Sequence, residues 1–517
     1  MIESLTVRLR DLFAGVGGWR LAGADVDIGA LSYRSEQSGP GTLFFCVPGF
    51  VRDGHDFALD AVARGAAALC VERRLDLAVP QVVVPSVRWA MGSVAAAFYG
   101  HPSSRLLTVG ITGTNGKTTS AFLTAHLLDH AGFRSGLMGT VERRIGGQTL
   151  PAGRTTPEAL DIQRDFAQMA AGGDRAAVME VSSHALDLGR ARGIDFRTVA
   201  FTNLTQDHLD YHKTLEDYFA AKCRLFLDDE FASGGAAAVI NVDDPFGCRL
   251  AEACDRDRVI SFSTSAAVPG WGSADLEMSE SVMTPGGTRG VLAVRGTALA
   301  RVSGATGEDR AGEIRREVFT RLVGAFNVAN TLTALGCGVG LGLDLEGMLT
   351  GLGDFKGVPG RMEPVDAGQA FSVLVDYAHT PDSVRNVLKT AREFTRGRLI
   401  AVLGCGGDRD RTKRPLMGRQ AEELADVVVV TSDNPRSEDP GAIIAEILEG
   451  LRRPASAEVQ PDRRLAIYYA VGQAGSDDVV LILGKGHESG QEFATETIPF
   501  DDRQVAREAL VARGPKS

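Results

Sequence analysis

One short segment of the 517-residue chain carries the residue types that bind the phosphates of a nucleotide. It reads Gly113-Thr114-Asn115-Gly116-Lys117-Thr118-Thr119, follows the apolar stretch 106–112 and opens a stretch with helical spacing at 119–130. Backbone N–H groups of such a loop, with the positive end of the following helix, bind phosphate oxygens. Lys117 would reach the terminal phosphates, and the hydroxyl of Thr118 would bind Mg²⁺. The segment therefore predicts a P-loop.

Six further clusters of polar residues follow apolar, strand-like stretches. They lie at 180–184, 203–208, 376–379, 404–409, 433–436 and 484–488. In an open α/β sheet, ligands bind just beyond the carboxyl ends of the strands. The carboxylate of Glu180 and the imidazole of His208 could together hold a second Mg²⁺ ion. Any one cluster could be a helix cap or a turn, but six of them at strand ends favour a binding site.

Lys222 lies in a stretch of predicted helix that is rich in apolar residues, Tyr218-Phe219-Ala220-Ala221-Lys222. Considered alone, it is best interpreted as a surface lysine whose stem covers apolar surface. If it were instead buried near a metal, burial would lower its pKa. Only the resulting neutral amine can add CO₂ and become a carbamate.

The elements that must position these residues follow from the alternation of strand-like and helical stretches. The strand-like runs lie at 106–112, 177–181, 199–203, 238–242, 372–376, 399–403, 427–431 and 479–483. Such alternation predicts an α/β fold with doubly wound, mostly parallel sheets. The polar, glycine-rich stretch 263–315 predicts a β-meander or a loop.

Two segments rich in Pro, Gly and Ser, at 101–104 and 357–360, mark joints between domains. They predict a small N-terminal α/β domain (1–103), a central P-loop domain with a doubly wound sheet (104–358) and a C-terminal Rossmann-like α/β domain (359–517). Three domains also agree with a length of 517 residues at about 150 residues per domain.

Composition restricts the class of partner and the compartment. The formal net charge is −11, which disfavours binding to nucleic acid through a basic surface. The seven cysteines contain no C-x-x-C pair, as is typical of reduced thiols in a cytosol. No apolar run approaches the ~18 residues of a membrane span, and no signal peptide is recognisable. We expect a cytoplasmic monomer without stable membrane insertion.

Together these residues resemble the Mur ligase family, whose members use ATP to form the amide bonds of the peptidoglycan stem peptide. Gly113-Thr114-Asn115-Gly116-Lys117-Thr118 resembles the family P-loop. Glu180 and His208 match the Mg²⁺ positions, and Lys222 matches the carbamylated lysine of the family. The resemblance implies ATP, two Mg²⁺ ions held by Thr118, Glu180, His208 and the Lys222 carbamate, and catalysis by Lys117, Lys222, His208 and Glu180.

Three other motifs resemble family segments on the nucleotide side. They are Gly324-x-Phe326-Asn327-x-x-Asn330, Gly360-Arg361-Met362-Glu363 and Asp376-Tyr377-Ala378-His379-x-Pro381. The first resembles the adenine-side motif, and the other two resemble segments of the third domain that close over ATP. The resemblance therefore adds Asn327, Asn330, Arg361 and Asp376 to the ATP-binding residues.

Within the family, the chain resembles the members that add meso-diaminopimelate to UDP-N-acetylmuramoyl-L-alanyl-D-glutamate. The resemblance assigns the UDP precursor to Ser35, Thr155, Thr156, Ser182 and Arg190. It assigns diaminopimelate to Arg409, Asp433, Asn434, Pro435, Arg436, Gly484 and Glu488. The first domain departs from the family pattern, because Arg34-Ser35-Glu36 stands where members usually have Asp-Ser-Arg. The contacts to uridine are therefore left open.

The resemblance implies a two-step reaction. The D-glutamate γ-carboxylate attacks the γ-phosphate of ATP, and the amine of diaminopimelate then displaces phosphate from the acyl phosphate. His208 is interpreted as a metal ligand and not as a base. Two alternatives are a lysine-adding or folylpolyglutamate-type ligase of the same superfamily, and a non-enzymatic nucleotide-binding partner of a glutamine amidotransferase. The Asp433-Asn434-Pro435-Arg436 motif disfavours the first, and the lack of a four-cysteine zinc insertion disfavours the second.

Overall fold

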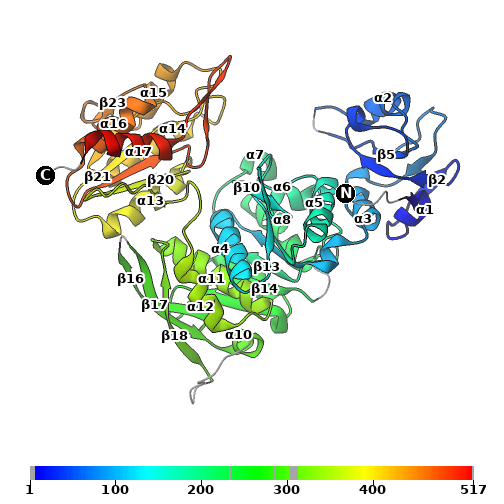
Figure 1. Ribbon diagram of the computed structural model, residues 1–517, viewed down its shortest axis with the longest axis horizontal. Coiled ribbons are helices and arrows are strands. Elements are labelled where there is room, and N and C mark those ends of the chain that lie inside the picture. The colour runs from blue at the N-terminus through cyan, green and yellow to red at the C-terminus, as the bar shows by residue number, and fades with distance from the viewer. Residues whose placement is uncertain (1–5, 50, 232–234, 285, 303–311, 515–517) are drawn as a thin grey trace. The chain divides into compact units, whose positions relative to one another are not determined.

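The computed structural model describes residues 6–49, 51–231, 235–284, 286–302 and 312–514 (Figure 1). Its described residues form three larger sheets with helices around them, and two sheets of two strands each, which confirms the predicted α/β fold class. They divide into two compact units. The first lies within Met1–Ser279, Val291–Arg316 and Ala329–Leu352, and the second within Glu280–Gly290, Glu317–Val328 and Gly353–Ser517.

The N-terminal sheet has five strands in the order β2-β7-β6-β5-β4. Their bounds are β2 Arg20–Ala22, β4 Ala30–Ser32, β5 Thr42–Phe45, β6 Ala68–Val71 and β7 Gln81–Val83. The β4–β7 neighbours are parallel, and β2 is antiparallel to β7. Helix α3 (Val87–Phe98) packs on this sheet and also against α5 (Ala159–Ala171) of the central domain.

The central sheet has eleven strands, and its middle part is parallel. The order is β11-β10-β9-β12-β8-β13-β14-β15-β16-β17-β18. The parallel strands are β9 Ser135–Met138, β12 Ala176–Glu180, β8 Leu107–Thr112, β13 Thr198–Phe201, β14 Ala237–Asn241, β15 Val259–Ser263 and the start of β16 Leu276–Thr284. The antiparallel strands β10 Glu142–Ile145 and β11 Gln148–Pro151 extend one edge.

Most helices of the central domain lie between these strands in the chain, and α11 and α12 follow the last strand. They include α4 Lys117–His130, α5, α6 Ser183–Asp187, α7 Leu209–His212, α8 Leu215–Leu227, α9 Pro245–Ala253, α11 Ala325–Gly340 and α12 Leu345–Asp354. The stretch predicted as a meander contains β16, β17 Gly287–Val294 and the start of β18 Ile314–Thr320. It also contains the short helix α10 Gly296–Arg301, which the sequence did not predict.

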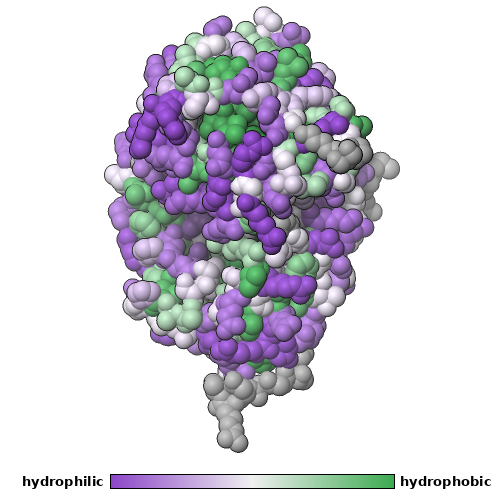
Figure 2. All heavy atoms as spheres, turned by 90° about the vertical axis from the view of Figure 1, so that its left-hand side faces the viewer, coloured by the Kyte–Doolittle hydropathy of each residue, from purple (hydrophilic) through white to green (hydrophobic). Residues whose placement is uncertain are grey.

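The C-terminal sheet has six strands in the order β19-β20-β24-β21-β22-β23. Their bounds are β19 Glu363–Pro364, β20 Ser372–Asp376, β24 Val479–Leu483, β21 Leu399–Leu403, β22 Val427–Val430 and β23 Glu458–Val459. The last five are parallel. Its helices are α13 Pro381–Phe394, α14 Lys413–Leu424, α15 Pro440–Leu448, α16 Arg463–Gln473 and α17 Asp502–Arg513. Figure 2 shows hydrophobic side chains scattered among more numerous polar ones on the face it draws.

The predicted strands agree with the observed ones within about two residues, and 372–376, 399–403 and 479–483 agree at both ends. The reason is burial: β8, β12 and β24 consist almost entirely of buried residues, so their apolar runs are unbroken. Among the described residues, no helix is long and apolar enough to cross a membrane.

Candidate active site

The predicted P-loop forms the turn between β8 and α4. Gly113 and Gly116 have φ values of 147° and 85°, which favour glycine. A Cβ on Gly113 would lie 1.9 Å from Thr202 Oγ1, and a Cβ on Gly116 would lie 2.3 Å from Asn330 Oδ1. The loop therefore requires glycine at both positions, and it packs against the end of β13 and against α11.

A second segment, just after β13, holds the tip of the loop. The Asn115 backbone N–H donates to Asn203 Oδ1 at 2.9 Å, and the Thr114 N–H donates to the Asn203 carbonyl at 2.9 Å. The Thr205 N–H donates to Thr114 Oγ1 at 3.0 Å. These bonds fix the loop before any ligand binds.

Two lysines converge on one carbonyl of the P-loop. Lys117 Nζ donates to the carbonyls of Gly113 (3.0 Å) and Thr114 (2.8 Å), and Lys222 Nζ donates to the Gly113 carbonyl at 2.8 Å. Lys222 is 1% exposed and lies over the Tyr218 ring. The interpretation of Lys222 as a surface residue was wrong, because α8 turns this side chain towards the loop. Burial, with the charge of Lys117, lowers the pKa of Lys222 well below its usual value.

Glu180, the last residue of β12, is buried beside the start of α4. Its Oε2 accepts from Thr118 Oγ1 at 3.1 Å, and its Oε1 accepts from the Thr140 backbone N–H at 2.8 Å. A Cβ on Gly139 would lie 2.4 Å from Glu180 Oε1. A carboxylate and a hydroxyl are oxygen ligands of the kind that Mg²⁺ prefers. The adjacent pair Thr118 and Glu180 therefore fits one Mg²⁺ ion.

His208 lies in an exposed turn with φ 53°, and its ring packs in an aromatic cluster. The ring centroid is 4.8 Å from that of His184 and 6.0 Å from that of Tyr218. Over the part of the chain that the structure describes, no three His, Cys, Asp or Glu side chains form a group that could hold a metal ion. The assignment of His208 and the Lys222 carbamate to a second metal therefore stays a prediction.

Three of the residues assigned to the UDP precursor form one hydrogen-bonded group. Thr156 Oγ1 bonds to the Glu180 carbonyl (2.9 Å) and to Ser182 Oγ (3.3 Å), and Ser182 caps α6. Arg190 donates to the Thr156 carbonyl at 3.3 Å and pairs with Glu158 at 3.0 Å. Burial lowers the pKa of Arg190. Thr155 Oγ1 lies 3.0 Å from Thr140 Oγ1, and so joins the same group to the Glu180 carboxylate.

Ser35 lies apart from that group, in a short 3₁₀ helix of the N-terminal domain that spans Ser35–Gln37. Its side chain is hydrogen-bonded to Asp60. The neighbouring Tyr33 donates to Asp161 Oδ2 on α5 at 2.6 Å. The segment therefore contacts the helix that follows Thr155 and Thr156.

Asn327 and Asn330 lie one turn apart on α11. Asn330 Oδ1 accepts from Ser120 Oγ on α4 at 3.4 Å, which places this amide beside the P-loop helix. Asn327 Nδ2 donates to the Val323 carbonyl at 2.8 Å.

In the second unit, Asp376 and Arg361 organise the end of β20. The buried Asp376 carboxylate accepts from the backbone N–H groups of Met362 (2.7 Å) and Ala378 (2.8 Å), and burial raises its pKa. The Arg361 guanidinium lies 4.9 Å from the centroid of the Tyr377 ring. Asp376 thus binds the backbone of the 360–363 and 376–381 motifs, and each of its carboxylate oxygens accepts one of these hydrogen bonds.

The segments that follow β22 and β24 contact each other and contain the residues assigned to diaminopimelate. Asn434 Nδ2 donates to Glu488 Oε2 at 2.8 Å, while the fully buried Lys485 donates to Asn434 Oδ1 (2.8 Å) and Glu488 Oε2 (3.1 Å). A Cβ on Gly484 would lie 2.3 Å from Asp433 Oδ2. The side chain of Arg409 is exposed and donates to the Asp408 carbonyl at 3.2 Å.

Arg436 follows Pro435 with φ 51° and is half-buried. Its Nε pairs with Glu492 Oε2 at 2.7 Å, and one terminal nitrogen donates to the Gly407 carbonyl at 2.8 Å. Its guanidinium is thus held in place by the protein itself. A ligand carboxylate at this position would compete with Glu492.

Comparison with known proteins identifies the family. Three family models match: the Mur ligase middle domain at residues 111–338, the Mur ligase glutamate ligase domain at 360–486 and the Mur ligase family catalytic domain at 27–99. A curated protein of Geobacillus thermodenitrificans (strain NG80-2) is 46% identical over 98% of this chain and 100% of its own length. The chain belongs to the Mur ligase family.

Other relatives agree with this membership. A protein of Gloeobacter violaceus is 47% identical over 98% of this chain and 99% of its own. It and the Geobacillus protein are both named UDP-N-acetylmuramoyl-L-alanyl-D-glutamate--2,6-diaminopimelate ligase. A solved structure of an enzyme with that name is 33% identical and has a TM-score of 0.67, over 94% of this chain and 95% of its own. The resemblance drawn from the motifs is confirmed.

Some residues of this Mur ligase emerged only from the structure. Thr140 bonds Glu180 through both its backbone and its hydroxyl, and Lys485 joins Asn434 to Glu488. Lys485 stands within a segment already singled out, so its motif could have indicated it. Thr140 had no such signal, because it meets Glu180 through the neighbouring strands β9 and β12.

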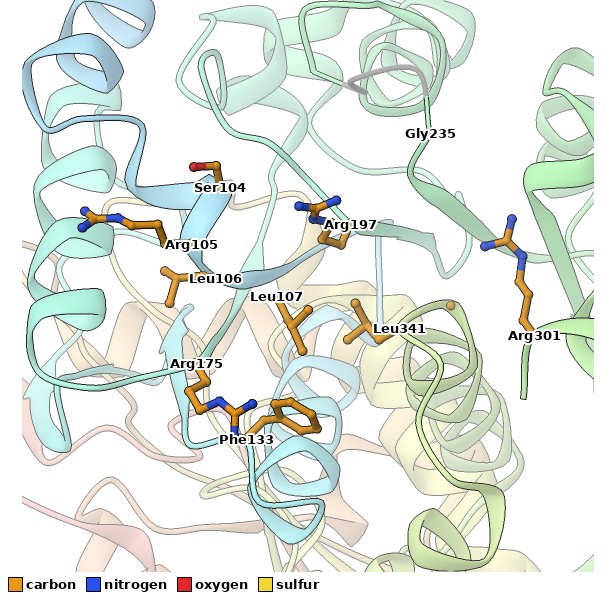
Figure 3. Close-up of a pocket in the computed structure, with 11 residues that line it drawn as sticks. Ser104, Arg105, Leu106, Leu107, Phe133, Arg175, Arg197, Gly235, Arg301 and Leu341 are labelled. Atoms are coloured by element: carbon orange, nitrogen blue, oxygen red, sulfur yellow. The ribbon is translucent and has the colours of Figure 1, made fainter. Parts of the chain in front are cut away.

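A pocket of about 490 Å³ lies in the first unit, and residues at the amino ends of β8, β12 and β13 line it (Figure 3). Arg175 stacks on Phe133 at 4.5 Å, and Arg301 donates to the Asp257 carbonyl at 2.9 Å. Helices α4, α5 and α11 end near these residues, and arginines stabilise the negative ends of helices. The pocket is at the edge opposite to the P-loop and holds none of the assigned residues. Its lining is Ser104, Arg105, Leu106, Leu107, Phe133, Arg175, Arg197, Gly235, Arg301, Gly340 and Leu341.

Proposed function

We propose that this Mur ligase uses ATP to join meso-diaminopimelate to the D-glutamate γ-carboxylate of UDP-N-acetylmuramoyl-L-alanyl-D-glutamate, in the cytoplasm, during peptidoglycan synthesis. The observation that carries the proposal is 46–47% identity, over 98% of the chain, to relatives named for that reaction. The groups around Glu180 and Asn434 support it, because each assembles residues of a motif on which the resemblance rested.

In the first step, a γ-carboxylate oxygen attacks the γ-phosphorus of ATP, the β–γ bridging bond breaks and ADP leaves. Two anions must approach each other, so the barrier is largely electrostatic. The P-loop N–H groups and Lys117 bind phosphate oxygens. To do so, Lys117 gives up its hydrogen bonds to the Gly113 and Thr114 carbonyls. Thr118 and Glu180 would hold Mg²⁺, which would supply charge neutralisation at the phosphates and help to orient the γ-phosphate.

In the second step, the amine of diaminopimelate attacks the acyl carbon, the C–O bond to phosphate breaks and the nitrogen loses a proton. Glu488 pairs with the distal ammonium of the amino acid, and Arg436 pairs with the distal carboxylate. Lysine lacks that carboxylate, so its ammonium would lie near the Arg436 cation and Arg436 would keep only its pair with Glu492. A site that offers a cation to this carboxylate disfavours an amino acid that lacks it.

Lys222 acts as a carbamate in this proposal. Its burial and lowered pKa support a neutral amine that can take up CO₂. With His208, the carbamate would supply an anionic ligand for a second Mg²⁺ ion.

The decisive experiment measures ADP release by the purified chain with ATP, Mg²⁺ and the UDP-muramoyl dipeptide, over a panel of amino acids. ADP release that depends on meso-diaminopimelate, with kcat/KM at least a hundredfold above that for L-lysine, is the expected result. Lys117→Ala should abolish it, and Lys389→Ala, at an exposed position on α13, should not. Equal kcat/KM for the two amino acids would move the chain to the lysine-adding class.

A further inference from the structure

The C-terminal domain contains a completely buried ion pair that the proposed reaction does not use. Arg463, the first residue of α16, and Asp502, the first residue of α17, both have side chains 0% exposed. Arg463 Nε donates to Asp502 Oδ1 at 2.8 Å, and a terminal nitrogen donates to Oδ2 at 2.7 Å. The pair is thus bidentate and fixes the orientation of the guanidinium plane.

The remaining donors of Arg463 point at two strand ends. One terminal nitrogen donates to the Leu483 carbonyl at 2.9 Å, and the other donates to the Ser432 carbonyl at 3.3 Å. Leu483 immediately precedes Gly484, and Ser432 immediately precedes Asp433. One rigid group therefore contacts the backbone of both segments assigned to the diamino acid.

These two segments are not neighbours in the sheet. They follow β24 and β22, which are separated by β21. Their spacing must nevertheless be accurate, because Asp433 Oδ2 lies so close to Gly484 that a Cβ there would be 2.3 Å away. Gln491 adds a hydrogen bond on one side only, from its side-chain amide to the Asp433 carbonyl at 2.7 Å. The side chains of Asn434, Lys485 and Glu488 also connect the two segments. Arg463 differs from them because it holds the backbone carbonyl that precedes each segment.

Stability alone does not account for this arrangement. A buried ion pair loses most of its Coulombic gain to desolvation, and apolar residues of similar volume often stabilise a fold as well or better. What apolar residues cannot do is donate hydrogen bonds to two strand-end carbonyls at a fixed distance.

We propose that Arg463, oriented by Asp502, is a positioning residue that sets the spacing between the 433–436 and 484–488 segments and thereby the affinity for the acceptor amino acid. The inference rests on the proposed function for the nature of that amino acid. It does not require Arg463 to touch the substrate.

Two variants of the full-length chain test the role. Arg463→Lys keeps the charge but cannot make the planar fork, and Asp502→Asn keeps the shape but loses the charge that orients it. We expect KM for diaminopimelate to rise at least tenfold in Arg463→Lys and at least threefold in Asp502→Asn. KM for ATP and for the UDP dipeptide should stay within twofold in both. The stabilising shift of Tm by added diaminopimelate should shrink in the same order.

Asp478→Asn is the matched control. Asp478 pairs with Arg398 at 2.8 Å at the amino end of β24, the strand whose other end Arg463 holds. This variant should lower Tm while leaving KM for diaminopimelate within twofold. A general loss of stability would instead affect all three variants alike.

The proposal is overturned if Asp502→Asn folds with an unchanged KM for diaminopimelate, or if all three KM values rise together. It is also overturned if Asp478→Asn raises the amino-acid KM equally, or if neither Arg463→Lys nor Asp502→Asn folds, since the pair would then serve the fold. Failure of the proposed function is separate. A wild type that accepts another amino acid refutes that function, and the same ratios are then measured with the accepted amino acid.

Discussion

The ammonium group of Lys222 lies in a part of the protein that disfavours charge. It is buried beside Lys117, with which it shares the Gly113 carbonyl, and both burial and the charge of Lys117 lower its pKa. A neutral amine at this position can react with CO₂, whereas an ordinary surface lysine stays protonated at neutral pH. The environment therefore selects the chemistry that the residue type alone does not determine.

We expect Lys222→Ala to lose most activity, because the second Mg²⁺ loses an anionic ligand. Added formate or acetate should partly restore turnover by occupying the vacated space. Lys222→Arg should not be rescued, since its guanidinium is always a cation and fills the space. Isotope-labelled CO₂ should give a carbamate NMR signal in the wild type and not in Lys222→Ala. Full activity of Lys222→Ala would refute the assignment.

Arg436 offers a second test at the residue scale. Arg436→Ala should raise KM for diaminopimelate at least about a hundredfold, as expected for loss of a charge-assisted contact in a closed site. KM for ATP should stay within a few-fold. Glu492→Gln is the matched variant, because it removes the carboxylate that competes for Arg436. It should leave this KM unchanged or lower it, and steady-state kinetics on both variants measure the contrast. A similar rise in the two variants would show that Arg436 only holds the loop.

At the scale of elements, the P-loop depends on close contact between β8, β13 and α11. Gly113→Ala should raise KM for ATP at least tenfold, because its Cβ would overlap Thr202 Oγ1. Gly132→Ala, just after the end of α4, is the control. It also has a positive φ, 82°, but no atom lies within 4 Å of its Cβ. Both variants should lose stability in urea titrations, Gly113→Ala the more because of the overlap with Thr202, and only Gly113→Ala should lose ATP affinity. Equal ATP affinity of Gly113→Ala and Gly132→Ala would mean that the P-loop tolerates displacement.

The segment after β24 should make the second unit sensitive to acid. Burial, with the charges of Arg361 and Arg503, lowers the pKa of His487 to about 4, from 6.5. Between these values the unfolded chain binds more protons than the folded one, so stability is present above pH 6.5 and is lost as pH falls towards about 4. The urea midpoint should therefore fall between pH 7 and pH 5.

His487→Gln should reduce that fall, since glutamine does not titrate. His130→Gln, at an exposed position of the first unit, should leave it unchanged. Parallel pH profiles for the wild type and His487→Gln would contradict the assignment of the acid sensitivity to this residue.

At the scale of the whole molecule, the two compact units have separate cores. One cluster of buried residues lies within 106–274, and two others lie within 362–483 and 365–510. We expect calorimetry to resolve two unfolding transitions. ADP should raise mainly the midpoint of the one that belongs to the first unit, because the P-loop lies in that unit and a ligand stabilises the fold that binds it. Lys117→Ala should weaken the shift, and equal shifts in both transitions would contradict separate unfolding.

The sequence by itself determined the local elements of this Mur ligase and the residues of its motifs. The P-loop was recognisable because strand, glycine turn and helix are contiguous, and β20, β21 and β24 were recognisable because buried parallel strands are unbroken apolar runs. The family followed from the same short motifs.

Only the tertiary structure decided which side chains meet. Glu180 and Thr118 are 62 residues apart, Arg436 and Glu492 are 56 apart, and Arg463 and Asp502 are 39 apart. Lys222 is buried because α8 packs its side chain against a loop 109 residues earlier. Helical spacing can give the face of a helix on which a residue lies, but not what packs against that face. Burial and partners, which set pKa and hydrogen bonding, come from contacts between segments that are distant in the sequence.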